Sequence, residues 1–409
     1  MSNHFKTIVC LLTFFAAATH CSLAGTLPAA HITLGDEVFL RESWHDLHGR
    51  CVGVITNQSG VTSALEPIVD AIRRNPAICI KAIYSPEHGL RGDRPAGSYV
   101  GSYVDPRTNL PVYSLYGATR HPNAQMLGGV DVLLFDIQDV GNRAYTYIST
   151  MAYAMQAAKE FHKEIWILDR PNPIGGHVIE GPVLDPKFSS FIGLYPIAMR
   201  HGMTVGELAR LFNDRFAIGA NLRVIAMRRY KRAMLWPDTG LQWVQTSPNI
   251  PEWDTTVVYP TTGLIDSAGI SNGTGFTKPF KLAGSAVIDG QKLADTLNAR
   301  ALAGVYFRAA YWTPFSGFWK EKQLSGVELV VYDPRVYRSV HGAVEILTAV
   351  REMSPGPISY RAHDLDIDWG TDTLRMGLQE GWSAQAIERQ WDWGVAAFMK
   401  LRAKYLLYQ

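Results

Sequence analysis

Several patterns that would assign a protein to a cofactor class are missing from this chain of 409 residues. The dinucleotide-binding pattern G-x-G-x-x-G does not follow the first predicted strand, and the phosphate-binding pattern G-x-x-x-x-G-K-[ST] does not occur. The zinc-binding pattern H-E-x-x-H is absent as well. We therefore expect neither a nucleotide cofactor nor a bound metal.

An excess of charge of either sign is also lacking. The chain has 39 Lys and Arg residues against 37 Asp and Glu residues, which gives a formal net charge of +2. This balance argues against a nucleic-acid partner and against a polybasic membrane-binding surface. Aromatic residues make up 11% of the chain, which is compatible with clefts that stack on sugars, although large cores also use aromatic residues.

No apolar run after residue 24 reaches the 18 residues that a membrane-spanning helix needs. Residues 1–24 instead resemble a secretory signal, with Lys6 before a short apolar stretch at 8–18 and small residues at 22–24. We expect the mature chain to begin at Gly25. We also expect the protein to be exported and to be periplasmic or secreted.

Cysteine is scarce, with four residues, and two of them, Cys10 and Cys21, lie in the predicted signal. Cys51 and Cys79 each begin a predicted strand. If these strands are parallel neighbours, the two thiols could form a disulfide in an oxidising compartment. Two buried free thiols are the alternative interpretation.

From residue 51 the chain alternates between short apolar runs and helical patterns. The runs at 51–56, 79–84, 131–137, 165–168 and 222–227 have the length and composition of buried strands. Helical patterns are found at 32–50, 63–74, 146–161 and 204–212, the last with a capping box that begins at Thr204. This alternation predicts an α/β fold, with a Rossmann-like, doubly wound and mainly parallel sheet in a first domain at 25–235.

The composition changes near residue 235, which predicts a second, smaller α+β domain at 236–409. Its segment 236–284 is rich in Pro, Trp, Thr and Gly, and we expect this segment partly to line a cleft between the two domains. Strands are expected near 305–312 and 326–332, and helices near 291–300, 338–353, 372–380 and 383–406. The alternating acids Asp364, Asp366 and Asp368 are expected in a solvated turn, because they lack the Gly and closing Glu of a calcium loop.

Polar residues follow four of the predicted strands at the point where each strand ends. These residues are Asn57 and Gln58, then Glu87 and His88, then Asp136, Gln138, Asp139 and Arg143, then Asp169, Arg170 and Asn172. Ligands of doubly wound sheets bind outside the carboxyl ends of the strands. The sequence therefore predicts a site at this edge of the sheet.

The carboxylates at this edge suit glycoside cleavage. That reaction needs a carboxylic acid to protonate the leaving oxygen, and opposite it a base, a nucleophile or the substrate's own 2-acetamido group. Glu87 is the candidate acid, with His88 beside it, because Pro86 fixes its turn and burial would raise its pKa. Asp136 and Asp139 are candidates for the second carboxylate, and capping of a turn is the alternative role for Asp136.

The arginines and tyrosines near the same edge are candidates for holding a substrate. Arg143, Arg170 and Arg200 could bind an anionic group, since guanidinium pairs with carboxylate through two hydrogen bonds, and a structural ion pair is the alternative for each. Tyr145 and Tyr147 could stack on a sugar or donate a hydrogen bond, and they could equally be core residues.

Six segments at these positions together resemble the exo-β-N-acetylmuramidase family of the NamZ type. The resemblance covers most of the mature chain, and the segments follow one another in the order 53–60 (GVITNQSG), 84–92 (YSPEHGLRG), 136–147 (DIQDVGNRAYTY), 168–176 (LDRPNPIGG), 180–182 (EGP) and 200–204 (RHGMT). It implies a Rossmann-like domain and a smaller C-terminal domain with a cleft between them. It further implies removal of N-acetylmuramic acid from the non-reducing end of peptidoglycan fragments, so that peptidoglycan-derived saccharides are the expected partners.

The resemblance places Glu87 on the proposed catalytic glutamate of the family, and the lactyl carboxylate of muramic acid would explain the arginines. The candidate catalytic residues are Glu87, His88, Asp136 and Asp139. The candidate substrate-binding residues are Asn57, Gln58, Gln138, Arg143, Tyr145, Tyr147, Arg170, Asn172, Arg200, His201 and Asn249.

The chain departs from the family pattern at 265–281. A Glu and an Arg that the family usually carries are Asn272 and Thr274 here, and a Phe-Glu-Gly segment reads Ile265-Asp266-Ser267. If the second domain contacts the substrate through these positions, the sugar specificity would change. The alternative function is therefore an exported amino-sugar-binding protein, or a glycosidase with altered sugar specificity.

Overall fold

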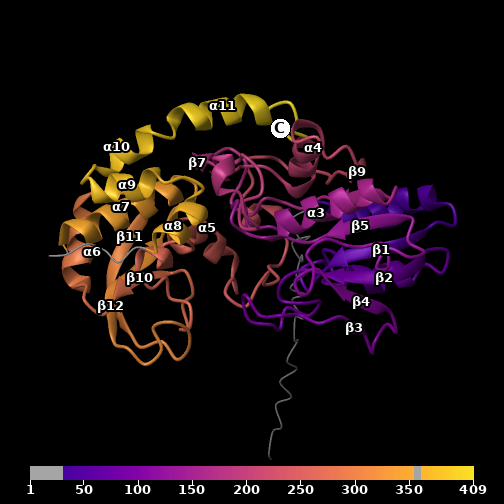
Figure 1. Ribbon diagram of the computed structural model, residues 1–409, viewed down its shortest axis with the longest axis horizontal. Coiled ribbons are helices and arrows are strands. Elements are labelled where there is room, and N and C mark those ends of the chain that lie inside the picture. The colour runs from indigo at the N-terminus through magenta and orange to yellow at the C-terminus, as the bar shows by residue number, and fades with distance from the viewer. Residues whose placement is uncertain (1–30, 354–360) are drawn as a thin grey trace, which may run out of the picture. The chain divides into compact units, whose positions relative to one another are not determined.

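The strands predicted in the first half of the chain form one seven-stranded sheet (Figure 1). The computed structural model describes residues 31–353 and 361–409, so the predicted signal lies outside the described residues. In spatial order the strands are β3 (Tyr103–Val104), β4 (Pro111–Ser114), β2 (Cys79–Ser85), β1 (Cys51–Thr56), β5 (Val132–Asp136), β6 (Glu164–Leu168) and β9 (Asn221–Ile225). All neighbours pair in parallel except β3 and β4. Since β2 and β5 flank β1 on opposite sides, the order of the strands reverses at β1 and β5.

Both faces of this sheet are buried. Successive side chains of a strand point to opposite faces, and every residue of β5 is buried. On β5, Leu134 packs with Ile68 and Ile72 of α2 (Ile68–Arg73), whereas Phe135 packs in a cluster with helices α3 (Tyr147–Glu160) and α4 (Val205–Arg215). The predicted α/β fold, with a mainly parallel and doubly wound sheet, is therefore confirmed.

Two of the predicted helices in this half are shorter or less regular than expected. The helix expected at 63–74 begins only at Ile68, because Pro67 occupies the N-cap position and Leu65 has a left-handed φ of 62°. Leu65, which lies in the predicted helix range but before α2, is 49% exposed. The stretch predicted as a helix at 32–50 divides into α1 (Gly35–Val38), a π-helical turn (Phe39–Ser43) and a 3₁₀ turn (Trp44–Leu47).

The second half contains a three-stranded antiparallel sheet with β12 (Leu324–Val331) between β10 (Leu282–Ser285) and β11 (Val305–Trp312). Helices α6 (Gly290–Ala299) and α7 (Ser339–Met353) pack together, and α6 contacts β11 and β12 while α7 contacts α5 (Trp253–Thr262). A two-stranded ribbon, β7 (Glu180–Val183) and β8 (Ala198–Arg200), precedes this half. Apolar side chains from both larger sheets, among them Phe135 and Phe307, belong to one core cluster.

Two expectations about the C-terminal residues are wrong. The helix predicted at 383–406 is two helices, α10 (Ala384–Arg389) and α11 (Asp392–Arg402), with α9 (Thr373–Gln379) before them. The acids expected in a solvated turn lie on a helix, α8 (Ala362–Trp369), and Asp366 is buried and paired with Arg375 at 2.8 Å. The sequence did not predict this helix, because its apolar face is formed mainly by Leu365 and Trp369 and the residues between them are largely acidic.

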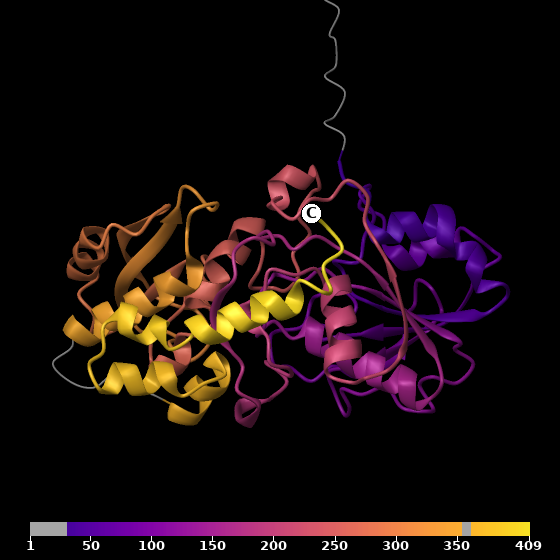
Figure 2. The same cartoon turned by 90° about the horizontal axis from the view of Figure 1, so that it is seen from above.

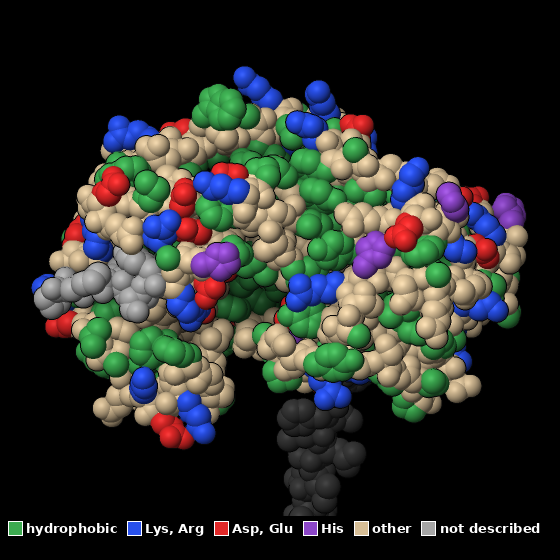
Figure 3. Space-filling model, viewed as in Figure 1, with side chains coloured by type: hydrophobic (Ala, Val, Ile, Leu, Met, Phe, Trp, Pro, Cys, Tyr) green, Lys and Arg blue, Asp and Glu red, His purple; other side chains and the backbone are tan. Residues whose placement is uncertain are grey.

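Helix α11 extends across the molecule towards the first sheet (Figure 2). It contacts β7, and the residues after it return to the seven-stranded sheet, where the Tyr408 hydroxyl donates to Asp169 at 2.6 Å. Figure 3 shows acidic and basic side chains interspersed on one face, as the small net charge suggests.

Cys51 and Cys79 form a disulfide between β1 and β2, with their Cα atoms 4.5 Å apart. They are direct partners in the parallel register of these strands. Of the two interpretations open from the sequence, the structure shows the disulfide. Over residues 31–353 and 361–409, no helix combines the length and apolar character needed to cross a membrane.

Candidate functional site

The candidate site lies at the carboxyl edge of the seven-stranded sheet, where β1 and β5 form the point of strand-order reversal. Ligands of doubly wound folds bind in the crevice outside this point. Asn57 and Gln58 follow β1, Gln138 and Asp139 follow β5, and Glu87 follows the neighbouring β2. The topology therefore brings these predicted residues to one edge.

Glu87 is held in a defined orientation by two hydrogen bonds. Its Oε1 accepts from the Gly97 backbone N–H at 2.9 Å and its Oε2 accepts from the Thr146 hydroxyl at 2.9 Å. Its side chain is half-buried. His88 has a φ of 71°, is 5% exposed and hydrogen-bonds through Nδ1 to the Arg94 carbonyl at 2.8 Å. The structure therefore gives His88 the role of fixing the turn that presents Glu87.

Tyrosines surround Glu87. Burial raises the pKa of Tyr116 and the negative charge of Glu87 raises it further. Glu87 also adds to the raised pKa of Tyr147, whose main cause is again burial. A phenol whose pKa is raised stays protonated, so it remains a hydrogen-bond donor. Glu87 thus lies in a neighbourhood of neutral hydrogen-bond donors.

Residues 245–246 cross this edge and are held by three predicted site residues. The Tyr147 hydroxyl donates to the Thr246 carbonyl at 2.6 Å, and the Tyr145 hydroxyl donates to the Thr246 hydroxyl at 2.7 Å. Gln58 Nε2 donates to the carbonyls of Gln245 and Thr246, each at 2.9 Å. Tyr145, Tyr147 and Gln58 therefore position the 245–246 segment beside Glu87.

Tyr259 of α5 brings the second half of the chain to the same site. Its ring meets the Tyr145 ring edge-on at 5.8 Å and the Phe280 ring at 4.8 Å. Burial raises its pKa, and the charges of Tyr145, Glu87 and Asp368 raise it further. None of the described residues hydrogen-bonds its hydroxyl, and Tyr259 as a whole is 9% exposed. Among the described residues, no group therefore competes with a ligand for this hydroxyl.

Asp139 and His201 form a buried pair below the edge. Asp139 Oδ2 accepts from the Gly141 N–H at 2.7 Å and lies 3.5 Å from His201 Nε2, while His201 Nδ1 accepts from the Met203 N–H at 3.2 Å. Asp139 Oδ1 is buried and has no partner among the described residues. Asp139 is 4% exposed, so a substrate can reach it only after local rearrangement.

Asp136 does not lie in the position that a second catalytic carboxylate needs. It is fully buried, and its oxygens accept from Arg170 Nε at 2.5 Å and Nη2 at 3.0 Å. Arg170 also pairs with Asp36 at 3.0 Å. Asp136 and Arg170 therefore belong to a structural ion network, and the substrate-binding role predicted for Arg170 is corrected to this one.

The other two predicted arginines are also structural. Arg143 is 1% exposed and donates to the carbonyls of Pro182 at 2.7 Å and Trp369 at 2.8 Å, and its burial lowers its pKa to about 10. Arg200 is 2% exposed and pairs with Glu180 at 3.0 Å. Neither guanidinium is exposed to a substrate carboxylate, because each points into the protein.

The predicted amides divide between structural and available groups. Asn172 is buried between the Met203 carbonyl and the Ile174 N–H, and Gln138 Nε2 donates to the Asp139 and Pro171 carbonyls. Asn57 Oδ1 accepts from Ser59, whereas its Nδ2 is a buried donor that has no partner among the described residues. Asn249 is half-buried. Of these four, Asn57 therefore combines proximity to the edge with an unused donor.

The departures at 265–281 have structural explanations. Asn272 is 4% exposed, and its Oδ1 accepts from the N–H and hydroxyl of Thr274, so the two residues close their own turn.

Residues 269–273 also match the pattern G-x-S-x-G of serine hydrolases. Ser271 is 2% exposed and accepts from the Gly273 N–H, which gives it no access to a substrate.

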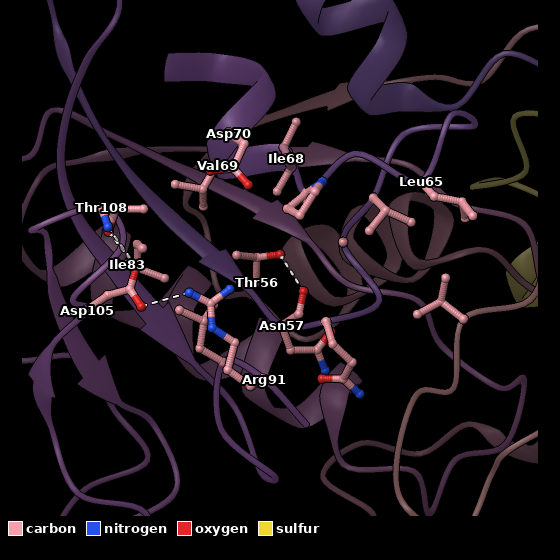
Figure 4. Close-up of a pocket in the computed structure, with 16 residues that line it drawn as sticks. Thr56, Asn57, Leu65, Ile68, Val69, Asp70, Ile83, Arg91, Asp105 and Thr108 are labelled. Atoms are coloured by element: carbon pink, nitrogen blue, oxygen red, sulfur yellow. Dashed lines mark hydrogen bonds and ion pairs between the residues drawn. The ribbon is translucent and has the colours of Figure 1, made fainter. Parts of the chain in front are cut away.

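A cavity of about 300 Å³ lies beside Asn57, between β1, α2 and the loop that carries Arg91 (Figure 4). Its walls are largely apolar and include Leu65 and Ile68, and Arg91 pairs with Asp105 at 2.7 Å on one side. Glu87 does not line this cavity.

Sequence reasoning missed Tyr116, Thr146, Thr246 and Tyr259. Thr146 could have been found, because it stands between the predicted Tyr145 and Tyr147. The other three lie in segments that do not directly follow any of the predicted strands, so nothing in the sequence indicated that they belong to the site.

Comparisons with known proteins identify the family of this chain. The family model for the N-terminal part of exo-β-N-acetylmuramidase NamZ matches residues 52–254, and the model for its C-terminal part matches residues 257–408. Peptidoglycan β-N-acetylmuramidase NamZ of Bacillus subtilis (strain 168) is 43% identical over 411 residues, covering 97% of this chain and 99% of that protein.

Two crystal structures of DUF1343 family proteins from Bacteroides fragilis NCTC 9343 are also similar, and each matches 93% of this chain. One has a TM-score of 0.87 at 37% identity over 100% of its chain, and the other has a TM-score of 0.75 at 28% identity over 99% of its chain. Since both family models and a relative of near-equal extent match, the chain belongs to the exo-β-N-acetylmuramidase NamZ family.

Proposed function

We propose that this protein is an exo-acting glycoside hydrolase that removes β-linked N-acetylmuramic acid from the non-reducing end of peptidoglycan fragments. Membership of the NamZ family and the 43% identity to a peptidoglycan β-N-acetylmuramidase support the reaction class. The observation that carries the proposal for this chain is the setting of Glu87. Among the carboxylates that follow the strands of the first sheet, Glu87 is half-buried, whereas Asp136, Asp139 and Asp169 are buried.

Glu87 is the proposed general acid. Its carboxylic proton passes to the glycosidic oxygen as the bond to C1 breaks, and the remaining carboxylate is stabilised by Thr146 and the Gly97 N–H. Asp136 is engaged by Arg170 and Asp139 is buried, so neither of the two carboxylates predicted as the partner of Glu87 is exposed to a substrate. This favours attack on C1 by the 2-acetamido oxygen of the substrate, followed by a water that returns a proton to Glu87.

Export belongs to the proposal, because peptidoglycan lies outside the cytoplasm and the sequence predicts a signal at 1–24. We further propose the division into domains at 25–235 and 236–409. The last strand of the seven-stranded sheet ends at Ile225 and the first strand of the three-stranded sheet begins at Leu282, which supports a boundary between them.

Glu87→Gln tests the proposed acid. The substitution keeps the size of the side chain and removes the transferable proton, so turnover of a chromogenic β-N-acetylmuramide should fall by about 10²–10⁴-fold. Glu321→Gln, at a glutamate whose side chain is 78% exposed, is the matched control and should leave turnover unchanged. Unchanged turnover in Glu87→Gln would remove Glu87 from the mechanism.

The wild-type protein should release the chromophore from the muramide and not from the matching β-N-acetylglucosaminide. Release from the glucosaminide alone would indicate altered sugar specificity. A folded protein that is silent on both substrates, yet is thermally stabilised by N-acetylmuramic acid, would instead be an exported amino-sugar-binding protein.

A further inference from the structure

A second cavity lies away from Glu87, between α5 and the end of β12. Its volume is about 430 Å³, which is enough to hold a sugar ring. Its polar and aromatic walls come from Trp253, Asp254, Lys281, Glu328 and Tyr332, and we refer to it as the α5–β12 pocket. None of the residues assigned to the candidate site lines it.

Two aromatic residues, Trp253 and Tyr332, line the α5–β12 pocket. Trp253 is half-buried at the start of α5, and Tyr332 is 69% exposed just after β12. Val257 and Val330 line the space together with these rings. Indole and phenol rings offer a flat apolar face with a polar edge, which suits the apolar face of a sugar ring better than it suits a fully apolar ligand.

The charged groups of the pocket are already paired. Lys281 Nζ contacts Asp254 Oδ2 at 2.8 Å and Glu252 Oε2 at 3.1 Å, and Glu328 pairs with Lys278 and Arg308. An anionic ligand would have to displace one of these ion pairs, whereas a neutral polar ligand would not. The pocket chemistry therefore favours an uncharged ligand.

One oxygen of the lining residue Asp254 is unused, and a ligand meets it only after the side chain turns. Asp254 Oδ1 is buried and has no hydrogen-bond partner among the described residues, although Oδ2 of the same carboxylate is held by Lys281. Once turned towards the pocket, a carboxylate oxygen accepts a hydrogen bond from a hydroxyl or an amide N–H. Hydroxyl groups and an acetamido N–H are the donors that an N-acetylated amino sugar provides.

Different residues of helix α5 contribute to this pocket and to the candidate site. Trp253, Asp254, Val257 and Val258 line the pocket, whereas Tyr259, about 100° further round the helix, contacts the Tyr145 ring of the candidate site. A ligand in the pocket would thus contact α5, the helix that also carries Tyr259, without contacting Glu87.

We propose that the α5–β12 pocket is a second saccharide site, which binds a neutral N-acetylglucosamine-type residue of a glycan chain. The identity of the chain as peptidoglycan rests on the proposed function. The binding of a neutral amino sugar rests on the pocket alone. This site holds the polymer on the protein while its non-reducing end reaches Glu87.

Tyr332→Ala in the full chain tests the proposal, with N,N′-diacetylchitobiose as the probe and isothermal titration as the measurement. Loss of one aromatic platform should weaken binding by about tenfold. Tyr311→Ala is the matched control, because Tyr311 is 71% exposed on β11 of the same sheet and does not line the pocket. Both tyrosines are exposed, so both variants should keep the wild-type melting temperature.

Absence of chitobiose binding to the wild type, or equal affinities of the two variants, would overturn the proposal. Binding of a stem-type peptide in place of the sugar, with the same loss in Tyr332→Ala, would overturn the ligand class. The kinetic counterpart is a raised KM of Tyr332→Ala on long peptidoglycan fragments, with unchanged turnover of the small muramide. A wild-type protein that binds chitobiose but cleaves no muramide would refute the proposed function and leave this site standing.

Discussion

At the scale of single residues, the tyrosine hydroxyls of the candidate site are not equivalent. Those of Tyr145 and Tyr147 are occupied by Thr246, whereas that of Tyr259 has no partner among the described residues. The occupied hydroxyls hold the 245–246 segment in place. We propose that the Tyr259 hydroxyl is the one that contacts substrate.

Tyr259→Phe should therefore reduce kcat/KM on the muramide while leaving the fold intact. The ring contacts with Tyr145 and Phe280 remain, and one substrate hydrogen bond of about 0.5–1.5 kcal/mol is lost, so the reduction should be about two- to thirteenfold. Steady-state kinetics and a thermal melt are the measurements.

Tyr145→Phe provides the contrast. It removes the hydrogen bond to Thr246, so it should lower the free energy of unfolding by about 1 kcal/mol. If Tyr259→Phe loses stability in the same way and keeps its kinetics, its hydroxyl serves the fold and not the substrate.

The roles of the arginines could not be predicted from the sequence. The pattern correctly places Arg143 and Arg170 after strand ends, and only the fold shows which way each guanidinium points. Arg143 donates to carbonyls as distant in the sequence as Trp369, and Arg170 pairs with Asp36, which precedes the first strand. Partners this remote leave no trace in the local spacing.

At the scale of elements, the start of α4 was predicted correctly from its capping box. Thr204 and Glu207 form the predicted capping box, in which the Glu207 N–H donates to Thr204 and the Thr204 N–H donates to Glu207 at 3.0 Å. The Thr204 hydroxyl additionally donates to Asp169 at 2.8 Å. A single hydroxyl therefore caps a helix and contacts the adjacent sheet.

Thr204→Ala should lower the free energy of unfolding by about 1–2 kcal/mol, since it removes the cap and one hydrogen bond to Asp169. Chemical denaturation measures the change. Thr204→Ser keeps the hydroxyl and should lose less than half as much. Equal losses in the two variants would assign the effect to the missing methyl group instead of the cap.

The buried strands of the first sheet were predicted, whereas the short strands β3, β4, β7, β8 and β10 were not. β1 was predicted with its observed bounds, because β-branched runs end sharply at polar turns. The helices α5 and α8 were missed because α5 has Pro260 inside it and α8 is rich in aspartate. Tertiary packing of Tyr259 and Leu365 stabilises both helices, and no local pattern reports such packing.

At the scale of the whole molecule, Asp169 connects the first sheet to residues near the C-terminus. It is fully buried, and its oxygens accept from Arg170 N, Gly206 N, the Thr204 hydroxyl and the Tyr408 hydroxyl. Burial raises the pKa of Asp169 to about 7, although these hydrogen bonds oppose the shift.

This shift predicts how stability depends on pH. The raised pKa means that the folded state keeps a proton that the unfolded state releases above its ordinary pKa of about 4. The contribution is fully present below about pH 4 and is lost as the pH rises through about 7, with a slope of up to about 1.4 kcal/mol per pH unit.

Asp169→Asn removes the titration. The difference in free energy of unfolding between wild type and variant should therefore shift in favour of the variant as the pH rises from 4 to 8. Denaturation at several pH values measures it. Parallel curves for the two proteins would contradict the assignment.

The contacts of residues 405–409 also restrict which parts of this protein can be exchanged with a relative. The two family models meet between residues 254 and 257, a boundary that suggests two interchangeable modules. Tyr408 nevertheless bonds to Asp169, and Arg232 donates to the Tyr408 carbonyl at 3.2 Å. A hybrid joined at residue 255 would therefore need a second half whose last residues fit the first sheet of the other parent. The first half and the last residues of the second half therefore have to come from compatible parents, although these last residues lie more than 150 residues from the junction.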